Sequence, residues 1–151
     1  MEKISYDSVE SRLITAINHL RTRDTYLIEH NLHERTIVHR LAIYLEELFP
    51  TWHVDCEYNN DRGTVKRITA IHDKLQTFLS KDPTATDLHA TDDASGNTQT
   101  VFPDLIVHRR STQENLLVIE VKQNCATSPY DQKKLCLYLS EFGYQYAVLS
   151  G

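Results

Sequence analysis

The sequence has 151 residues, of which 40% are hydrophobic and 25% are charged, with only four glycines and four prolines. This length and composition predict one ordinary globular domain with a sizeable core, and they exclude a chain that is disordered throughout. The net charge of -5 argues against a protein that coats nucleic acid by charge alone, although it leaves open an enzyme that acts on nucleic acid.

No apolar run approaches the roughly 20 residues of a membrane-spanning helix, and no apolar stretch follows the first charges, so we expect no membrane association. The cysteines, Cys56, Cys125 and Cys136, are odd in number, widely spaced and not in CxxC pairs. They indicate neither a disulfide framework nor a zinc site. A reducing, cytoplasmic location is therefore expected.

In the first third of the chain, apolar residues recur at helical spacing. They predict a first helix over about 7–20, behind an Asp7 cap, and a second over about 32–49, ended by Pro50. Residues 52–58 alternate between apolar and polar side chains, which is typical of a strand. We treat residues 5–30 as an N-terminal helical extension.

An insertion is expected between about 60 and 100. Apolar residues at spacings of three and four predict a helix over 65–79, which Asp82-Pro83 ends. From 81 to 100 the composition turns to small polar residues without periodicity, which predicts a long polar loop.

The last third predicts a sheet. Residues 101–108 and 116–122 carry apolar side chains on both faces, as central strands do. Ser128-Pro129 is typical of a helix start, so a helix is expected over 128–142, with Gly143 ending it and a final strand over 144–149. The expected fold is α/β: a single domain with a mixed central β-sheet flanked by helices.

Three charged residues stand out in this apolar region. Glu120 and Lys122 are two residues apart, so they share one face of their strand, roughly 6.5–7 Å apart along it. If the two strand segments pair, Asp104 can lie beside Glu120. Two close carboxylates repel, and a shared Mg²⁺ relieves that repulsion. An ammonium nearby can position a water and offset charge on a phosphate, so this set predicts phosphodiester hydrolysis.

Pro103-Asp104, followed after fifteen residues by Glu120-Val121-Lys122, resembles the motif of the PD-(D/E)xK nuclease superfamily. The order of elements from about 34 to 149 also resembles its restriction-endonuclease-like fold. The resemblance implies that Asp104, Glu120 and the Val121 carbonyl bind Mg²⁺, for which Mn²⁺ can substitute, and that Lys122 orients or activates water. It implies a nucleic-acid substrate, with DNA favoured over RNA.

The resemblance also implies a further acidic residue on the helix before the first strand, and Glu34 fits that place, with Glu57 ranked below it. Glu34 has a rival interpretation, because Asn31 lies three residues earlier at capping-box spacing. Both interpretations stay open. A helix cap at Ser128 accounts for Asp131, which we therefore leave outside the catalytic set.

Basic residues near these motifs are candidates for substrate binding. Lys133 and Lys134 follow on the next helix, where the superfamily often contacts the nucleic-acid backbone, and Arg109 and Arg110 lie in the turn between the central strands. The alternative is that they are solvated surface charges.

Other chemistries lack support. The eight histidines form no dense ligand set, and no P-loop, dinucleotide or serine-hydrolase motif is present. The alternative function is a non-catalytic module of nuclease fold that binds nucleic acid or a protein. The short chain also leaves open a homodimer or a partner that supplies specificity.

Overall fold

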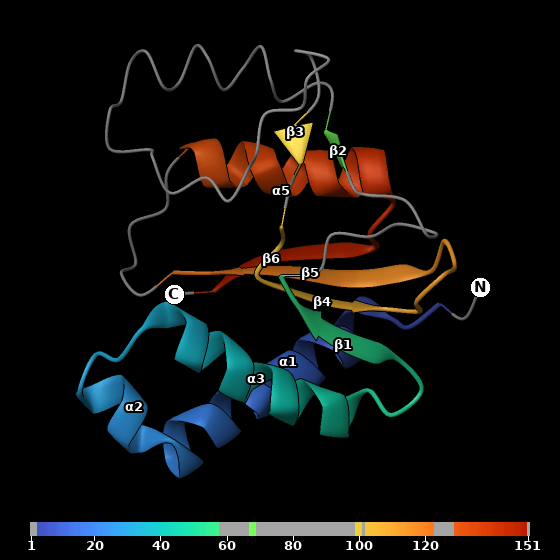
Figure 1. The fold of residues 1–151 in the computed structure, drawn as a ribbon. Coiled ribbons are helices and arrows are strands. Elements are labelled where there is room, and N and C mark those ends of the chain that lie inside the picture. The colour runs from blue at the N-terminus through green and yellow to red at the C-terminus, as the bar shows by residue number, and fades with distance from the viewer. Residues whose placement is uncertain (1–2, 58–66, 69–98, 101, 123–128, 151) are drawn as a thin grey trace, which may run out of the picture.

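The computed structural model describes residues 3–57, 67–68, 99–100, 102–122 and 129–150. It is a mixed α/β structure in which a β-sheet lies between helix α5 (Pro129–Phe142) on one face and α1 (Tyr6–Arg23) and α3 (Glu34–Leu48) on the other (Figure 1). In this part of the chain, no helix is long and apolar enough to cross a membrane.

Helix α1 begins one residue earlier than expected and has a different cap. Ser5 is the N-cap, and its hydroxyl accepts a hydrogen bond from the Ser8 amide over 3.3 Å, so the predicted Asp7 cap is wrong. Asp7 lies instead in the first turn, where a carboxylate favours the helix dipole. A short helix that was not predicted, α2 (Thr25–Glu29), follows directly.

Helix α1 belongs to the main core rather than standing apart from it. Its buried side chains join those of α3 and the sheet in one cluster, whose helical members are Val9, Leu13, Ala16, Leu20, Val38, Leu41, Tyr44 and Leu45. These residues recur at helical spacing, so each helix turns one continuous apolar stripe toward the sheet.

The sheet contains β1 (His53–Cys56), β4 (Leu105–His108), β5 (Asn115–Val121) and β6 (Tyr146–Ser150). The strand order is β1-β4-β5-β6. The β1/β4 and β4/β5 pairs are antiparallel, and β5/β6 is parallel. The sequence-based expectation of central strands is confirmed for β4 and β5, because every residue of both is buried.

Alternate residues of β5 face different layers. Leu117, Ile119 and Val121 join the core under α1 and α3, whereas Val118 joins a second cluster with Tyr138 of α5. Since side chains alternate along a strand, Glu120 belongs to the α5 side, together with Val118.

Two short parts of the predicted insertion, residues 67–68 and 99–100, belong to the described residues. Residues 67–68 were expected in a helix, but they form strand β2 (Arg67–Ile68), which pairs with β3 (Gln99–Thr100). The helix over 65–79 is therefore wrong at these residues, and the polar loop over 81–100 is wrong at its last two. The remainder of both predictions lies outside the described residues.

Strand β4 is shorter than the predicted 101–108, since it begins at Leu105. Pro103 has no backbone N–H to give to a neighbouring strand, so regular pairing starts beyond it. Asp104 consequently sits at the strand's entrance, not within it.

Candidate active site

The register of β4 and β5 places Asp104 opposite Glu120. Leu105 pairs with Ile119 in this antiparallel ladder, so the next position along brings the two acidic residues face to face. The Val121 amide confirms this proximity by donating a 2.8 Å hydrogen bond to Asp104 Oδ2. The predicted meeting of the Pro-Asp and Glu-x-Lys motifs is therefore present in the structure.

A third acidic residue lies beside Asp104 on the other side. The Glu57 amide donates a 3.2 Å hydrogen bond to the Asp104 carbonyl, immediately after the end of β1. Glu57 has a φ of 48°, so its backbone leaves the regular strand conformation there. Its exposed carboxylate forms an ion pair with Arg35 Nε over 3.3 Å.

Glu120 is a buried carboxyl group whose side chain is 5% exposed. Burial raises its pKa to about 8; the Lys134 ammonium acts in the opposite direction, and the Asp104 carboxylate adds to the rise. Lys134 Nζ lies 2.9 Å from Glu120 Oε1. Apart from this ion pair, no group in the described part of the chain makes a well-oriented hydrogen bond to that oxygen.

Lys122 forms an ion pair with a residue of α5, Asp131. Its Nζ lies 3.3 Å from Asp131 Oδ1, and the Asp131 side chain is buried. Burial lowers the pKa of Lys122, but Asp131 outweighs it, and Glu120 and Glu34 contribute further, so that the pKa is raised overall. Lys122 is consequently an ammonium at neutral pH, in the field of three carboxyl groups.

The charges of β5 and α5 match in pairs. Glu120 and Lys122 are two residues apart on the strand, and their partners Lys134 and Asp131 are three residues apart on the helix. Residues at both spacings share a face of their element, at similar separations. The helix therefore presents to each charged residue of the strand a partner of opposite sign.

A cleft of about 170 Å³ opens beside Asp104. Its lining residues are Glu34, Arg35, Val38, His39, Cys56, Glu57 and Asp104. The pKa of the Cys56 thiol is raised by burial and then by the nearby carboxylates Asp55, Glu57 and Asp104. Among these lining residues, three acidic side chains, Glu34, Glu57 and Asp104, stand against one guanidinium, that of Arg35.

The structure excludes one of the two interpretations of Glu34, the capping box. Glu34 is the first residue of α3, and the N-cap residue His33 makes no side-chain cap hydrogen bond. Asn31 has a φ of 49° and lies outside the helix. The capping box is therefore wrong, and Glu34 instead lines the cleft together with Asp104.

Asp131 is the site residue that sequence reasoning missed. We explained it as part of a helix start, but its carboxylate binds Lys122. The available signal was the Asp-x-x-Lys spacing on the predicted helix, which complements Glu-x-Lys on the strand. The proposed cap, Ser128, lies outside the described residues.

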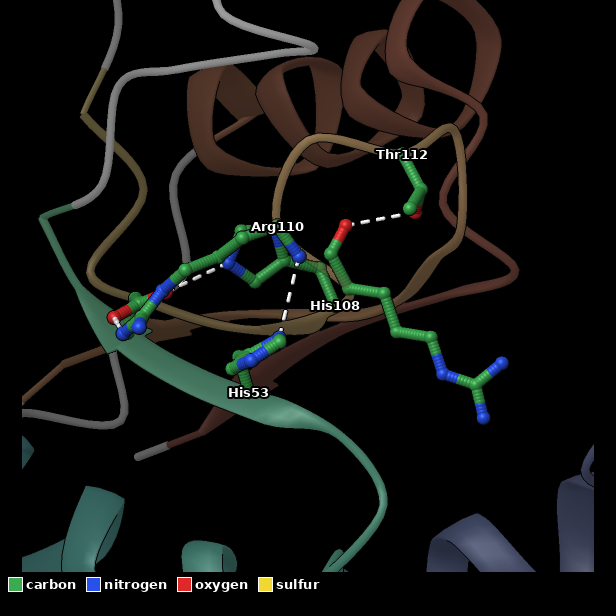
Figure 2. Close-up of polar contacts among 6 residues, drawn as sticks. His53, His108, Arg110 and Thr112 are labelled. Carbon is green, nitrogen blue, oxygen red and sulfur yellow. Dashed lines mark hydrogen bonds and ion pairs between the residues drawn. The ribbon is translucent and has the colours of Figure 1, made fainter.

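Arg109 and Arg110 lie away from this site, just beyond the opposite end of β4 from Asp104. Arg110 forms an ion pair with Asp55, and its amide donates to His53 Nδ1 over 3.2 Å (Figure 2). Arg109 pairs with Glu114 over 2.9 Å. Of the predicted substrate-binding residues, only Lys133 and Lys134 lie on the helix that faces Glu120 and Lys122.

The donor set suits Mg²⁺ better than a softer metal. Among the residues that the structure describes, no group of three or more His, Cys, Asp or Glu side chains is placed to hold a metal ion. Two carboxylates are nevertheless sufficient for Mg²⁺, which keeps several waters and binds through few protein oxygens. The buried Glu120 beside Asp104 fits such an ion, because a cation would relieve their repulsion.

Comparisons with protein-family models, with curated proteins and with solved structures find no match to this chain.

Proposed function

We propose that the protein is a metal-dependent nuclease of PD-(D/E)xK type, with a restriction-endonuclease-like fold, that hydrolyses phosphodiester bonds of nucleic acid. One observation carries the proposal: Asp104 and Glu120 face each other on adjacent strands, and Lys122 follows on the same face. Two carboxylates and an ammonium at one strand end are a suitable set for cutting a phosphodiester.

Asp104, Glu120 and the Val121 carbonyl would hold the metal, Mg²⁺ or in its place Mn²⁺. When bound, such a metal lowers the pKa of a coordinated water and offsets charge on the phosphate. The Val121 amide fixes the Asp104 carboxylate through its 2.8 Å hydrogen bond, so this ligand is oriented before any metal arrives.

Lys122 acts as a cation rather than as a base, because its pKa is raised by Asp131, Glu120 and Glu34 against the effect of burial. Its N–H groups orient the attacking water and stabilise negative charge on the phosphate. The water oxygen forms a bond to phosphorus while the bond to the leaving oxygen breaks. The attacking water releases a proton to the solvent and the leaving oxygen takes one from it, which yields a phosphomonoester and a hydroxyl group. Glu34 lines the same cleft as Asp104 and assists from the α3 side.

We propose DNA as the favoured substrate, with Lys133 and Lys134 near its backbone, and a cytoplasmic location. Cys56 and Cys136 are free thiols, as a reducing compartment favours. A homodimer, or a partner that supplies specificity, would compensate for the small size of the domain.

The test is cleavage of plasmid DNA, duplex and single-stranded oligonucleotides and RNA, with Mg²⁺, Mn²⁺ or EDTA. We expect cleavage that depends on the metal and is lost in Asp104→Asn, Glu120→Gln and Lys122→Met. Glu46→Gln is the matched control, since Glu46 is exposed on α3 and lies outside the site. If the folded protein cleaves none of these substrates, the proposed nuclease activity is wrong.

The second candidate is a non-catalytic module of the same fold that binds nucleic acid or a protein. It is favoured by the ion pairs of Glu120 with Lys134 and of Lys122 with Asp131, since paired charges also suit a purely structural role. Retained binding to an oligonucleotide without cleavage, at every metal tested, would favour this module.

A further inference from the structure

Lys134 occupies the position of a cation at the proposed metal site. Its Nζ lies 2.9 Å from Glu120 Oε1, and the two side chains are only 16% and 5% exposed. A buried carboxylate needs a positive partner, and in the described residues this ammonium supplies it. A metal ion and the Lys134 ammonium would therefore both be attracted to the same buried carboxylate, that of Glu120.

We propose that Lys134 is a built-in counter-cation of Glu120, which holds this carboxylate in the absence of metal and competes with a divalent cation for it. The inference rests on the proposed function, because it takes Glu120 as a metal ligand. A divalent cation on the carboxylate would face an ammonium a few ångströms away with little water between them, so the two cations destabilise each other.

The aromatic ring of Tyr138 offers the Lys134 ammonium a second contact besides Glu120. The face of the buried Tyr138 ring lies 5.7 Å from Nζ, one helical turn further along α5, and aromatic faces attract ammonium groups. Lys122 is not an equivalent competitor, because Asp131 holds its ammonium. The competing charge is thus specific to Lys134.

The experiment measures Mn²⁺ binding by calorimetry in the absence of nucleic acid. We compare the wild type with Lys134→Met, Glu120→Gln and Lys133→Met, the last being the matched control because it removes the same charge from the adjacent, exposed residue. We expect Lys134→Met to bind Mn²⁺ about tenfold more tightly than the wild type. Lys133→Met should stay near the wild type, and Glu120→Gln should lose binding.

A thermal melt supplies a second measurement. Without metal, and at a pH above the Glu120 pKa of about 8, where this side chain is a carboxylate, Lys134→Met should melt below the wild type, because Glu120 loses its positive partner. Mn²⁺ should then raise the Tm of this variant by more than it raises the wild-type Tm, since a ligand stabilises the form it binds more tightly. Lys134→Gln, with a shorter neutral side chain, replaces Lys134→Met if the latter does not fold.

The outcomes separate the two proposals. Suppose that the wild type binds Mn²⁺ through Glu120, but that Lys134→Met binds Mn²⁺ with equal or lower affinity. Lys134 then does not compete with the metal, and the counter-cation inference is wrong. An equal gain in Lys133→Met would reduce the effect to net charge and also overturn it. No Mn²⁺ binding by the wild type or by Lys134→Met would reject the metal site, and with it the proposed function.

Discussion

Asp104 accepts a hydrogen bond from the backbone amide of Val121 across 2.8 Å, which holds its carboxylate against the peptide that follows Glu120. One contact thereby fixes the distance between the two acidic residues and satisfies an amide in the buried strand β5. The carboxylate of Asp104 has both a structural role as an acceptor and a proposed chemical role as a negative charge, and substitutions can separate the two.

Asp104→Asn should abolish cleavage and Mn²⁺ binding while leaving stability nearly unchanged. An asparagine carbonyl can still accept the hydrogen bond from Val121, so only the charge is removed. Asp104→Ala should lose about 1–3 kcal/mol of unfolding free energy as well, because the buried amide loses its acceptor. Urea denaturation and calorimetry measure the two effects. Equal losses of unfolding free energy in Asp104→Asn and Asp104→Ala would show that the hydrogen bond from the Val121 amide is not the contribution of Asp104 to stability.

Glu120 should make the stability of the metal-free protein depend on pH. Burial raises its pKa from 4.5 to about 8, so between these values the folded protein keeps a proton that the unfolded chain releases. Stability must therefore fall as the pH rises through this window, by up to about 1.4 kcal/mol per pH unit. Glu120→Gln should lack this contribution, and urea midpoints from pH 5 to pH 9 compare it with the wild type.

The control for this titration is Glu46→Gln, which removes an exposed carboxylate from α3. Its unfolding free energy should stay within about 0.5 kcal/mol of the wild-type value, as is usual for a substitution at an exposed position. Parallel curves for Glu120→Gln and the wild type would mean that Glu120 titrates in the folded protein as it does in the unfolded chain.

The meeting of Asp104 and Glu120 was predictable because it depends on local signals. Strands with apolar side chains on both faces must lie inside a sheet, and a short polar turn joins such neighbours antiparallel. Alternation along the strand then places Glu120 and Lys122 on one face. Each step uses residues close together in the sequence, and each is present in the structure.

The partners of these residues were not predictable in the same way. Asp131 fits the sequence pattern of a helix start, and this pattern explains the residue without any ion pair. Its ion pair with Lys122 forms only because α5 packs on the sheet. Asn31 and Glu34 matched a capping box by spacing alone, but the left-handed backbone at Asn31 delays the helix start. Local patterns therefore identified the strands, whereas contacts between layers required the structure.

Asp131→Asn should slow cleavage by up to about 100-fold, because Lys122 loses the partner that positions its ammonium. Asp131 is also the largest influence that raises the pKa of Lys122, so the pKa should fall in this variant. The alkaline limb of the kcat profile should then move to lower pH. An unchanged rate with an unchanged pH profile would contradict a positioning role for Asp131.

The cluster around Asp55 should affect stability and leave chemistry intact. His108, which is 3% exposed, has its Nε2 2.7 Å from Asp55 Oδ2, and Arg110 binds the same carboxylate. Although burial raises the pKa of Asp55, hydrogen bonds from Arg110 and His108 hold it below its usual value. The stabilisation is therefore present above pH 3.8 and is lost as the pH falls through the lower folded-state pKa.

Asp55→Ala should cost about 1–3 kcal/mol, because the buried His108 loses this hydrogen-bond partner. Arg110→Met removes a half-exposed ion pair and should cost about 1 kcal/mol or less. Arg110→Met should keep wild-type kcat per folded molecule, since Arg110 lies beyond the end of β4 that is opposite to Asp104. Urea denaturation with parallel cleavage assays measures both, and a lower kcat in folded Arg110→Met would instead place this end of the sheet in the substrate's path.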